Sequence, residues 1–282
     1  ADPVDPLAPA VATQPVATAD FGLVGVTADG PLDPQTRVLV RVRENGDWGA
    51  WEPLRITDHG PDPGSVEAVG ARYGTEPLLV DQADGVQVRM DTPGGAVPDN
   101  PQVMLVDNPV VSADAGLPMP QESATDLPIS TVEAATVTAP MPTIISREQW
   151  GADESLRSTG PRYSPTIKVA FVHHTTSTND YSPEDAAQQV RNLYGWYVKG
   201  LRYSDMAYNF LVDRYGRLYE GRAGGMGQAV VGGHTAGFNN DTFAVSAIGN
   251  FQKLNPPPDQ IAAIDQSVAS LLAWKLSLNH RN

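Results

Sequence analysis

Val169-Ala-Phe-Val-His-His-Thr175 is the stretch from which the fold of this chain can be worked out. Its apolar run predicts a buried β-strand over residues 167–173 that carries two adjacent histidines to its carboxyl end. That end of a strand is where α/β proteins commonly hold their ligands. Successive side chains of a strand point to opposite faces, so His173 and His174 cannot easily bind one metal ion together. We expect one to face a site and the other to face packing or supporting contacts.

Two later segments carry polar residues that suit the same site. In Ala207-Tyr-Asn-Phe-Leu-Val-Asp213, residues 208–212 predict a strand that returns through the turn at Gly216 into a second strand over 217–220. In Gly232-Gly-His-Thr-Ala-Gly-Phe-Asn239, two glycines precede His234 and allow the backbone to approach closely. These segments add a tyrosine and a third histidine to the first pair.

The rest of the second half predicts helices and one more strand. Residues 182–200 read as an amphipathic helix that starts at Ser-Pro-Glu-Asp and stops at a glycine. Residues 243–248 read as a strand and residues 259–278 as a second helix. A capping-box pattern at Ser146 and Gln149 opens the domain, which we place at residues 144–282. The order β-α-β-β-β-α favours an α/β mixed sheet flanked by helices.

The first half has a different composition. Residues 1–19 are rich in Pro, Ala and Asp and predict a disordered leader. Residues 20–108 carry short strands at 21–26, 37–43, 85–90 and 103–106, separated by turn clusters, which predicts an all-β sandwich-like module. Residues 109–143 have the Pro/Ala-rich composition of a linker, although their apolar residues can contact a neighbouring domain: Ile129, Val132 and Val137.

Three residues of the first module could belong either to function or to the scaffold. Trp48 and Trp51 stand close enough to stack on sugar rings, but packing at the end of the sandwich is the favoured interpretation. His59 lies in the turn cluster Asp58-His-Gly-Pro-Asp-Pro-Gly64 without a visible partner, and we interpret it as a solvated loop residue.

Charge and cysteine content exclude several classes of function. The net charge is −14 and no lysine precedes Lys168, which argues against a nucleic-acid partner and against docking on an anionic membrane. The absence of cysteine excludes disulfides and cysteine nucleophiles within these residues. No apolar run approaches the roughly 20 residues of a membrane span. Oligomeric state is not indicated.

The opening residues bear on location. Ala1-Asp-Pro-Val-Asp-Pro resembles what remains after signal-peptide cleavage at a small residue. We therefore expect an exported protein, secreted or held at the cell wall. The alternative is an arbitrary boundary of the chain.

The second half resembles peptidoglycan recognition proteins, which belong with the zinc-dependent N-acetylmuramoyl-L-alanine amidases. The resemblance covers about residues 143–282. Its motifs occur in the family's order: Ile145-Ser-Arg-Glu-Gln-Trp-Gly-Ala152, Phe171-Val-His-His-Thr175, the stretch 208–222, Gly233-His-Thr-Ala-Gly-Phe-Asn-Asn240 and Ile248-Gly-Asn-Phe251. Residues 20–108 more weakly resemble the β-rich module that precedes this domain in some large exported bacterial members.

The resemblance implies a mechanism and a set of site residues. It makes His173 a ligand of Zn²⁺ and Tyr208 a residue that assists catalysis. It implies that peptidoglycan or muropeptide binds along four further residues, which are His174, His234, Arg222 and Asn239. A zinc-activated water would attack the amide between muramic acid and L-alanine, and Tyr208 would help to stabilise the oxyanion.

Departures from the family pattern keep alternatives open. The family's other zinc ligands, a histidine and a cysteine or aspartate, follow the last helix, where this sequence offers only His280. We interpret the sequence as stopping before the zinc site is complete, with His280 as a less favoured ligand. The alternative function is a non-catalytic muropeptide-binding module, and a third is wall or partner anchoring by the β-module. The sequence also departs from the family's usual residues at Arg222-Ala-Gly-Gly-Met226 and at Phe238, and these departures bear on which stem peptide the site binds.

Overall fold

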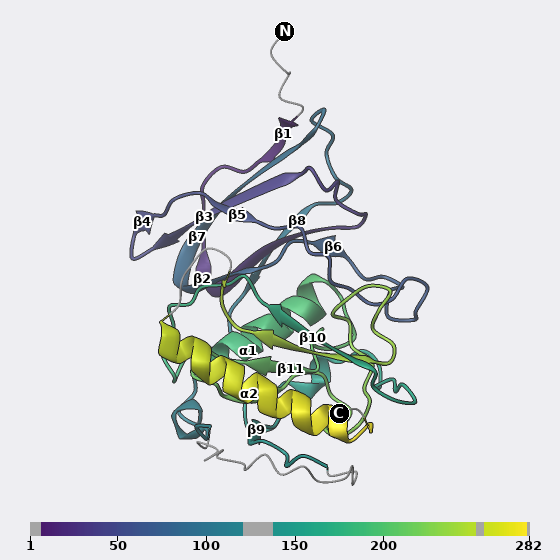
Figure 1. Ribbon diagram of the computed structural model, residues 1–282. Coiled ribbons are helices and arrows are strands. Elements are labelled where there is room, and N and C mark those ends of the chain that lie inside the picture. The colour runs from purple at the N-terminus through teal and green to yellow at the C-terminus, as the bar shows by residue number, and fades with distance from the viewer. Residues whose placement is uncertain (1–6, 121–137, 252–256, 281–282) are drawn as a thin grey trace.

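The computed structural model describes residues 7–120, 138–251 and 257–280 (Figure 1). The first domain is an antiparallel β structure in which β3, β7 and β2 are central. The hydrogen-bonded order is β4-β3-β7-β2-β6, with β1 added to β7, β5 to β3 and β8 to β2. The strands are β1 (Leu7–Ala12), β2 (Val16–Ala28), β3 (Arg37–Glu44), β4 (Asp47–Trp48), β5 (Glu52–Leu54), β6 (Tyr73–Gly74), β7 (Leu78–Pro93) and β8 (Gln102–Val106).

The core of this domain follows the alternation of its strands. Every second residue is buried in β3 from Val38 to Val42 and in β7 from Val86 to Met90, and these side chains pack with apolar side chains of β2. The members of this core include Phe21, Val24, Val38, Val40, Val42, Val86, Val88 and Met90. The predicted all-β sandwich-like module is confirmed.

The predicted disordered leader is wrong from residue 7 onward. β1 pairs with β7, and β2 already begins at Val16. Thr13 anchors the connection, since its backbone amide donates to Val88 at 2.9 Å and its hydroxyl accepts from the Val88 amide at 3.0 Å. Prolines are tolerated here because an edge strand does not need every N–H.

The predicted linker is partly fixed to the second domain. Residues 114–116 form a short 3-10 turn, η1 (Asp114–Gly116). The buried carboxylate of Asp114 pairs with Arg191, with 2.6 Å between Oδ2 and Nη2. The segment 121–137, with Ile129, Val132 and Val137, lies outside the described residues.

The second domain is a mixed sheet between two helices. Its strand order is β10-β13-β11-β12-β9, in which only the pair β11 and β12 is antiparallel. The strands are β9 (Ile144–Ile145), β10 (Val169–His174), β11 (Phe210–Val212), β12 (Leu218–Glu220) and β13 (Thr242–Ala247). The helical elements are η2 (Glu154–Leu156), α1 (Ala186–Gly195), the π-helical turn η3 (Trp196–Gly200) and α2 (Pro258–Ser277). The predicted α/β architecture is confirmed.

Alternation along the strands decides which helix each residue meets. Phe210 and Val212 pack with α2, whereas Leu211 between them packs on the side of α1. On that second side the sheet faces the first domain, because α1 and η3 contact β2. Figure 1 shows α1 between the sheet and the first domain, and α2 along the outer side.

β10 is an edge strand and not the buried strand that its apolar run predicts. Within the described residues it pairs only with β13, and none of its residues is fully buried, with Val172 58% exposed. A short apolar run has the same appearance in a central strand and in an edge strand, so periodicity alone could not separate them.

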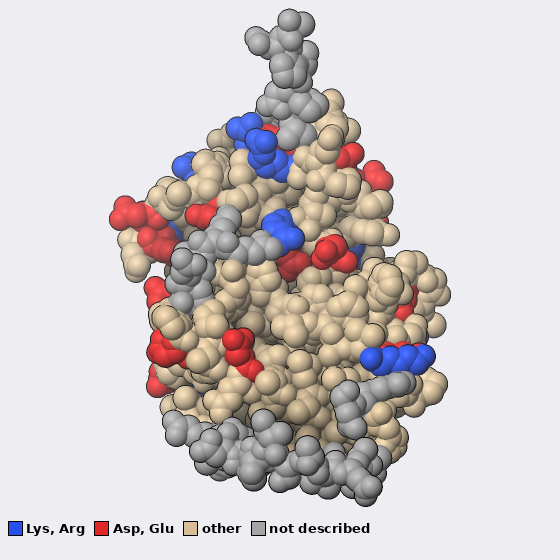
Figure 2. Space-filling view, viewed as in Figure 1, with Lys and Arg blue, Asp and Glu red and all other residues tan. Residues whose placement is uncertain are grey.

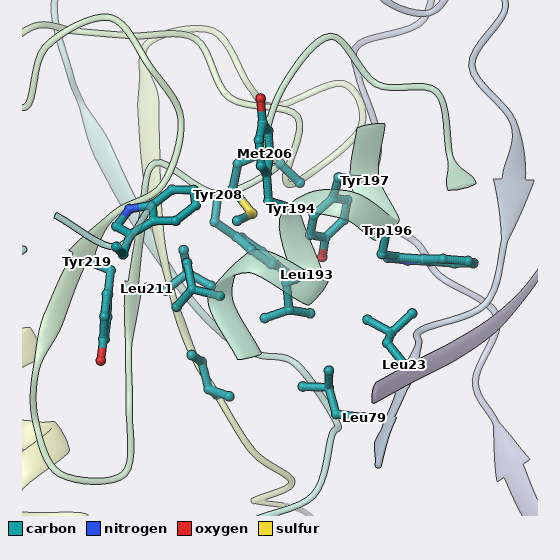
Figure 3. Close-up of a cluster of buried hydrophobic side chains, with 14 of the residues drawn as sticks. Leu23, Leu79, Leu193, Tyr194, Trp196, Tyr197, Met206, Tyr208, Leu211 and Tyr219 are labelled. Atoms are coloured by element: carbon teal, nitrogen blue, oxygen red, sulfur yellow. The ribbon is translucent and has the colours of Figure 1, made fainter. Parts of the chain in front are cut away.

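The two domains share one hydrophobic core, which Figure 3 shows in close-up. Leu23, Leu79 and Val106 of the first domain join Trp196 and Tyr197 of the second. A side chain on Gly25 would not fit, since its Cβ would lie 2.3 Å from the indole of Trp196. The domains are therefore packed together, and groups on either side of the contact are held in fixed positions.

Trp48 and Trp51 do not plug the sandwich, so the packing interpretation is wrong. Trp51 is exposed and Trp48 is only half-buried. The guanidinium of Arg41 lies 5.2 Å from the ring of Trp48 and 5.1 Å from the ring of Trp51, so the pair flanks a cation on the surface.

Candidate functional site

β10 delivers its two histidines to opposite sides of the sheet, as strand geometry requires. Phe171 and His173 lie on the side of α1 and the first domain, where Phe171 packs against the shared core. His174 lies on the other side, where its ring meets that of Phe251 at 6.1 Å between centroids. The amide of Phe251 donates to Nδ1 of His174 at 3.3 Å. The two side chains therefore lie on different sides of β10, although both reach the wall of the cavity described below.

The structure brings His173, Tyr208 and His234 together. The ring centroid of His173 lies 5.4 Å from that of Tyr208 and 5.8 Å from that of His234. Tyr208 comes from the segment that enters β11, and His234 from the loop before β13. Both are fully buried.

The His234 loop keeps its shape through one buried amide. The side-chain oxygen of Asn239 accepts from the backbone amides of His234 at 2.8 Å and Thr235 at 3.0 Å. Its side-chain nitrogen donates to the first domain, at the carbonyl of Gly60 and the carboxylate of Asp62. Asn239 therefore holds the loop and also joins it to the first domain.

A segment of the first domain, residues 57–72, lies over this cluster. Nδ1 of His59 is 2.7 Å from the hydroxyl of Tyr208, and their interaction is a hydrogen bond. Glu67 forms an ion pair with Arg222, and its carboxylate also accepts from the amide of Ser204 at 3.0 Å. Arg222 and Asn239, both predicted to bind substrate, are thus engaged by Glu67 and Asp62 in this structure.

A cavity of about 240 Å³ opens between the domains at this place. His173, His174 and His234 contribute to its wall from the second domain, so three of the predicted site residues share it. The remaining lining residues from the two domains are Arg55, Ile56, Asp58, His59, Glu76, Val172, Thr176 and Thr235. A larger hollow of about 630 Å³ on the first domain shares Arg55, Ile56 and Asp58 with it, so the two are adjacent.

Burial keeps the side chains of His173, His234 and Tyr208 uncharged, so that they can act as hydrogen-bonding groups and, for the histidines, as metal ligands. Burial, and then the neighbouring His59, lowers the pKa of His173 to about 4. Burial, and then His173, lowers the pKa of His234 to about 3. Both imidazoles therefore carry a free lone pair near neutral pH. Burial, reinforced by the charge of Glu76, raises the pKa of Tyr208 well above 10, so its hydroxyl keeps its proton.

The donor set suits a zinc ion. Neutral imidazole and carboxylate are zinc ligands, and His173 reaches the cavity wall beside His59 and Glu76. Asp58, His59 and Glu76 each offer a ligand atom, and these atoms lie within 4.8 Å of one another.

The interpretation of His59 as a solvated loop residue is wrong, since its side chain is only 9% exposed. Asp58 and Glu76 were also missed at the site. The signal available in the sequence was weak: a histidine beside an acid in a glycine- and proline-rich loop, the kind of segment that carries function on a rigid scaffold. Nothing local indicated that this loop meets residues more than a hundred positions away.

On the face drawn in Figure 2, acidic and basic side chains are interspersed and most of the surface is uncharged. Within the part of the chain that the structure describes, no helix combines the length and apolar character needed to cross a bilayer.

Two family models match the chain. Residues 163–281 match the N-acetylmuramoyl-L-alanine amidase family, and residues 2–114 match the family described as Rv3811 N-terminal galactose-binding domain-like. The two matches follow one another along the chain in the same order as the two domains of the structure.

Curated and solved relatives match the second half. Peptidoglycan-recognition protein 2 of Holotrichia diomphalia is 28% identical over 133 residues, covering 47% of this chain and 67% of that protein. Peptidoglycan recognition protein 4 of Mus musculus is 31% identical over 122 residues, covering 43% and 31%. The structure of Drosophila peptidoglycan recognition protein SA is 30% identical, with a TM-score of 0.42, covering 50% of this chain and 76% of that one. This chain spans about two thirds or less of the length of these curated relatives.

Proposed function

We propose that this protein hydrolyses the amide between N-acetylmuramic acid and L-alanine of peptidoglycan, since residues 163–281 match the N-acetylmuramoyl-L-alanine amidase family. The observation that carries the proposal is the meeting of His173, Tyr208 and His234 beside a cavity. A hydrolase of the cell wall acts outside the membrane, so we also propose that the protein is exported.

The residues of the cavity suit the binding of an uncharged amide and a polar sugar. His173 and His234 are neutral near pH 7, so they accept or donate single hydrogen bonds without carrying charge. The hydroxyl of Tyr208 retains its proton and lies one hydrogen bond behind the cavity wall, at His59. To stabilise the oxyanion that forms when an amide carbonyl is attacked, this hydroxyl would have to exchange its hydrogen bond with His59 for one to the substrate.

His173 is the proposed holder of zinc. A zinc ion bound there would polarise the amide carbonyl and make water nucleophilic near neutral pH. The contribution of the chain is to keep the His173 imidazole neutral by burial and to fix its ring between Phe171 and Tyr208. A ring held in this way presents its lone pair in one direction.

The test compares the wild type with Tyr208→Phe and His173→Ala on a muropeptide. Released stem peptide is measured by mass spectrometry, and muropeptide affinity is measured separately by calorimetry. We expect Tyr208→Phe to lower turnover on the order of 10²-fold while affinity changes little, because the lost hydroxyl acts on the transition state. His173→Ala should abolish turnover.

Equal turnover in the wild type and in Tyr208→Phe would remove Tyr208 from the mechanism. If the wild type binds the muropeptide but releases no stem peptide, the protein is a peptidoglycan-binding module and not an amidase. Under either function, Glu67 and Asp62 have to release Arg222 and Asn239 before these two residues can bind substrate. If the wild type neither binds nor cleaves the muropeptide, the proposal as a whole is overturned.

A further inference from the structure

We propose that the hollow of about 630 Å³ on the first domain is a binding site for the glycan strand of peptidoglycan, continuous with the cavity at the histidine cluster. The inference rests on the proposed function, because it takes peptidoglycan as the substrate. What it adds is a role for the first domain, which would hold sugar units of the polymer beyond the muramoyl residue whose amide is cleaved.

The hollow adjoins the cavity directly. Arg55, Ile56 and Asp58 line both, so a ligand that leaves the cavity past these residues enters the hollow. The cavity has a volume of about 240 Å³, which is below the roughly 300–1,000 Å³ of an ordinary ligand pocket, whereas the volume of the hollow lies within that range. A polymeric substrate needs more room than the cavity offers, and the hollow supplies it at the neighbouring position.

The place of Arg222 indicates which part of the substrate lies in the hollow. The amide that is cleaved joins a sugar to a peptide, so these two parts extend from the histidine cluster in different directions. The stem peptide ends in a carboxylate, for which a guanidinium is a strong partner, and Arg222 can offer one once Glu67 releases it. Arg222 lines a separate pocket that shares no residue with the hollow. The hollow is therefore left for the glycan.

The lining of the hollow suits an uncharged ligand rich in hydroxyl groups. The side chains of Gln35 and Thr57 offer donors and acceptors, while Arg37 adds donors and Asp58 adds acceptors. Both signs of charge occur, so the lining is not built for an anion or a cation alone. Tyr73 is 50% exposed and combines an apolar ring with a polar tip, a surface that can lie against the C–H face of a sugar.

The wall that carries Tyr73 is held in place by contacts within the first domain. The amide of Thr57 donates to the carbonyl of Gly74 at 3.0 Å. Beside Tyr73, the buried guanidinium of Arg72 donates to the hydroxyl of Thr27 at 2.9 Å. A wall of fixed shape has little conformational freedom to lose when a ligand binds, so this side of the hollow is preorganised.

The experiment measures binding of a peptide-free glycan to the complete chain. The probe is a tetrasaccharide of alternating N-acetylglucosamine and N-acetylmuramic acid, which contains no peptide to be cleaved, and its affinity is measured by calorimetry. We expect at least tenfold weaker binding in Tyr73→Ala and in Gln35→Ala than in the wild type. Trp51→Ala is the matched control and should bind as the wild type does, because Trp51 is an exposed aromatic residue of the first domain outside the hollow.

A wild type that does not bind the tetrasaccharide would overturn the proposal, and so would equal affinity in the wild type, Tyr73→Ala and Gln35→Ala. Loss of affinity only in Trp51→Ala would also overturn it, since the sugar would then bind at the tryptophan pair. Tyr73 and Gln35 are both exposed, so we expect their variants to fold, and circular dichroism with thermal unfolding checks this.

Release of stem peptide from a muropeptide, measured as above, tests the proposed function separately. A wild type that cleaves the muropeptide but does not bind the tetrasaccharide would overturn only the glycan site. A wild type that binds the tetrasaccharide through Tyr73 and Gln35 but cleaves nothing would support the glycan site and contradict only the amidase activity.

Discussion

At the scale of single residues, this protein relies on groups that are buried without their usual solvation. Burial keeps His173 and His234 neutral and keeps Tyr208 protonated, and the same cause acts on a lysine far from the cavity. Lys275 of α2 is 2% exposed, and its ammonium donates to the carbonyls of Met226 and Gln228. Burial lowers the pKa of Lys275 to about 8. An effect on stability follows.

The pKa of Lys275 makes stability depend on pH in a defined direction. Above pH 8 the folded lysine loses its proton while the unfolded one, with a pKa near 10.4, keeps it. The unfolded state then binds more protons, so stability rises with pH over this window. Between pH 7 and 9.5 the gain is about 2 kcal/mol, at about 1.4 kcal/mol per unit of pKa.

The check is the free energy of urea unfolding at several pH values for the wild type and for Lys275→Met. Subtracting the two curves removes the titration of tyrosines and other groups. The difference should rise in favour of the wild type from pH 7 to 9.5. Parallel curves would mean that Lys275 is charged to the same extent in both states.

At the scale of elements, the helix α1 is fixed by a charge pair as well as by apolar contacts. Arg191 extends from α1 to the Asp114 carboxylate of η1, and it also donates to the carbonyls of Trp150 and Pro109. Both partners of the ion pair are buried. Three segments that are distant in sequence are therefore tied together by one guanidinium: α1, residues 109–114 and the segment of Trp150.

Arg191→Met should destabilise the protein by about 3–5 kcal/mol, because the Asp114 carboxylate would stay buried without its partner. The comparison is Lys168→Met, which removes an ion pair with Asp241 that is largely exposed and should cost about 1 kcal/mol or less. Both are measured by urea unfolding at pH 7. Equal costs for the two variants would contradict the argument.

At the scale of the whole molecule, the two domains form one packed body. Their common core passes from β2 and β8 through η3 to the sheet of the second domain. The cavity, the cover over Arg222 and Asn239, and the His59 to Tyr208 hydrogen bond all depend on this docking. We therefore expect the wild type to unfold in one cooperative transition.

Gly25→Ala tests the docking, because the new Cβ would lie 2.3 Å from the indole of Trp196. Such overpacking typically costs about 1–3 kcal/mol. We expect separate unfolding transitions for the two domains, followed by tyrosine and tryptophan fluorescence and by circular dichroism. Gly30→Ala is the control, since its Cβ would make only an ordinary contact at 3.7 Å. A single unchanged transition in Gly25→Ala would show that the domains do not depend on this contact.

The elements and the main histidine cluster could be predicted from the sequence. Periodicity indicated the longer strands of both domains and the helix α2, because burial of one face leaves a repeating pattern in such elements. Alternation along β10 separated His173 from His174, and the motif order placed Tyr208 and His234 with them. All of these signals are local, or depend on pairing within a single domain.

Only the tertiary structure decided what the first domain brings to the cavity. His59 looked like a loop residue, and Glu76 had no feature of its own, until the docking placed both beside His173. The edge position of β10 and the strand formed by residues 7–12 were equally hidden. The physical reason is the same in each case. The free energy that stabilises these arrangements comes from contacts between segments that are distant in sequence, and the residue pattern of one segment does not indicate which other segment it will contact.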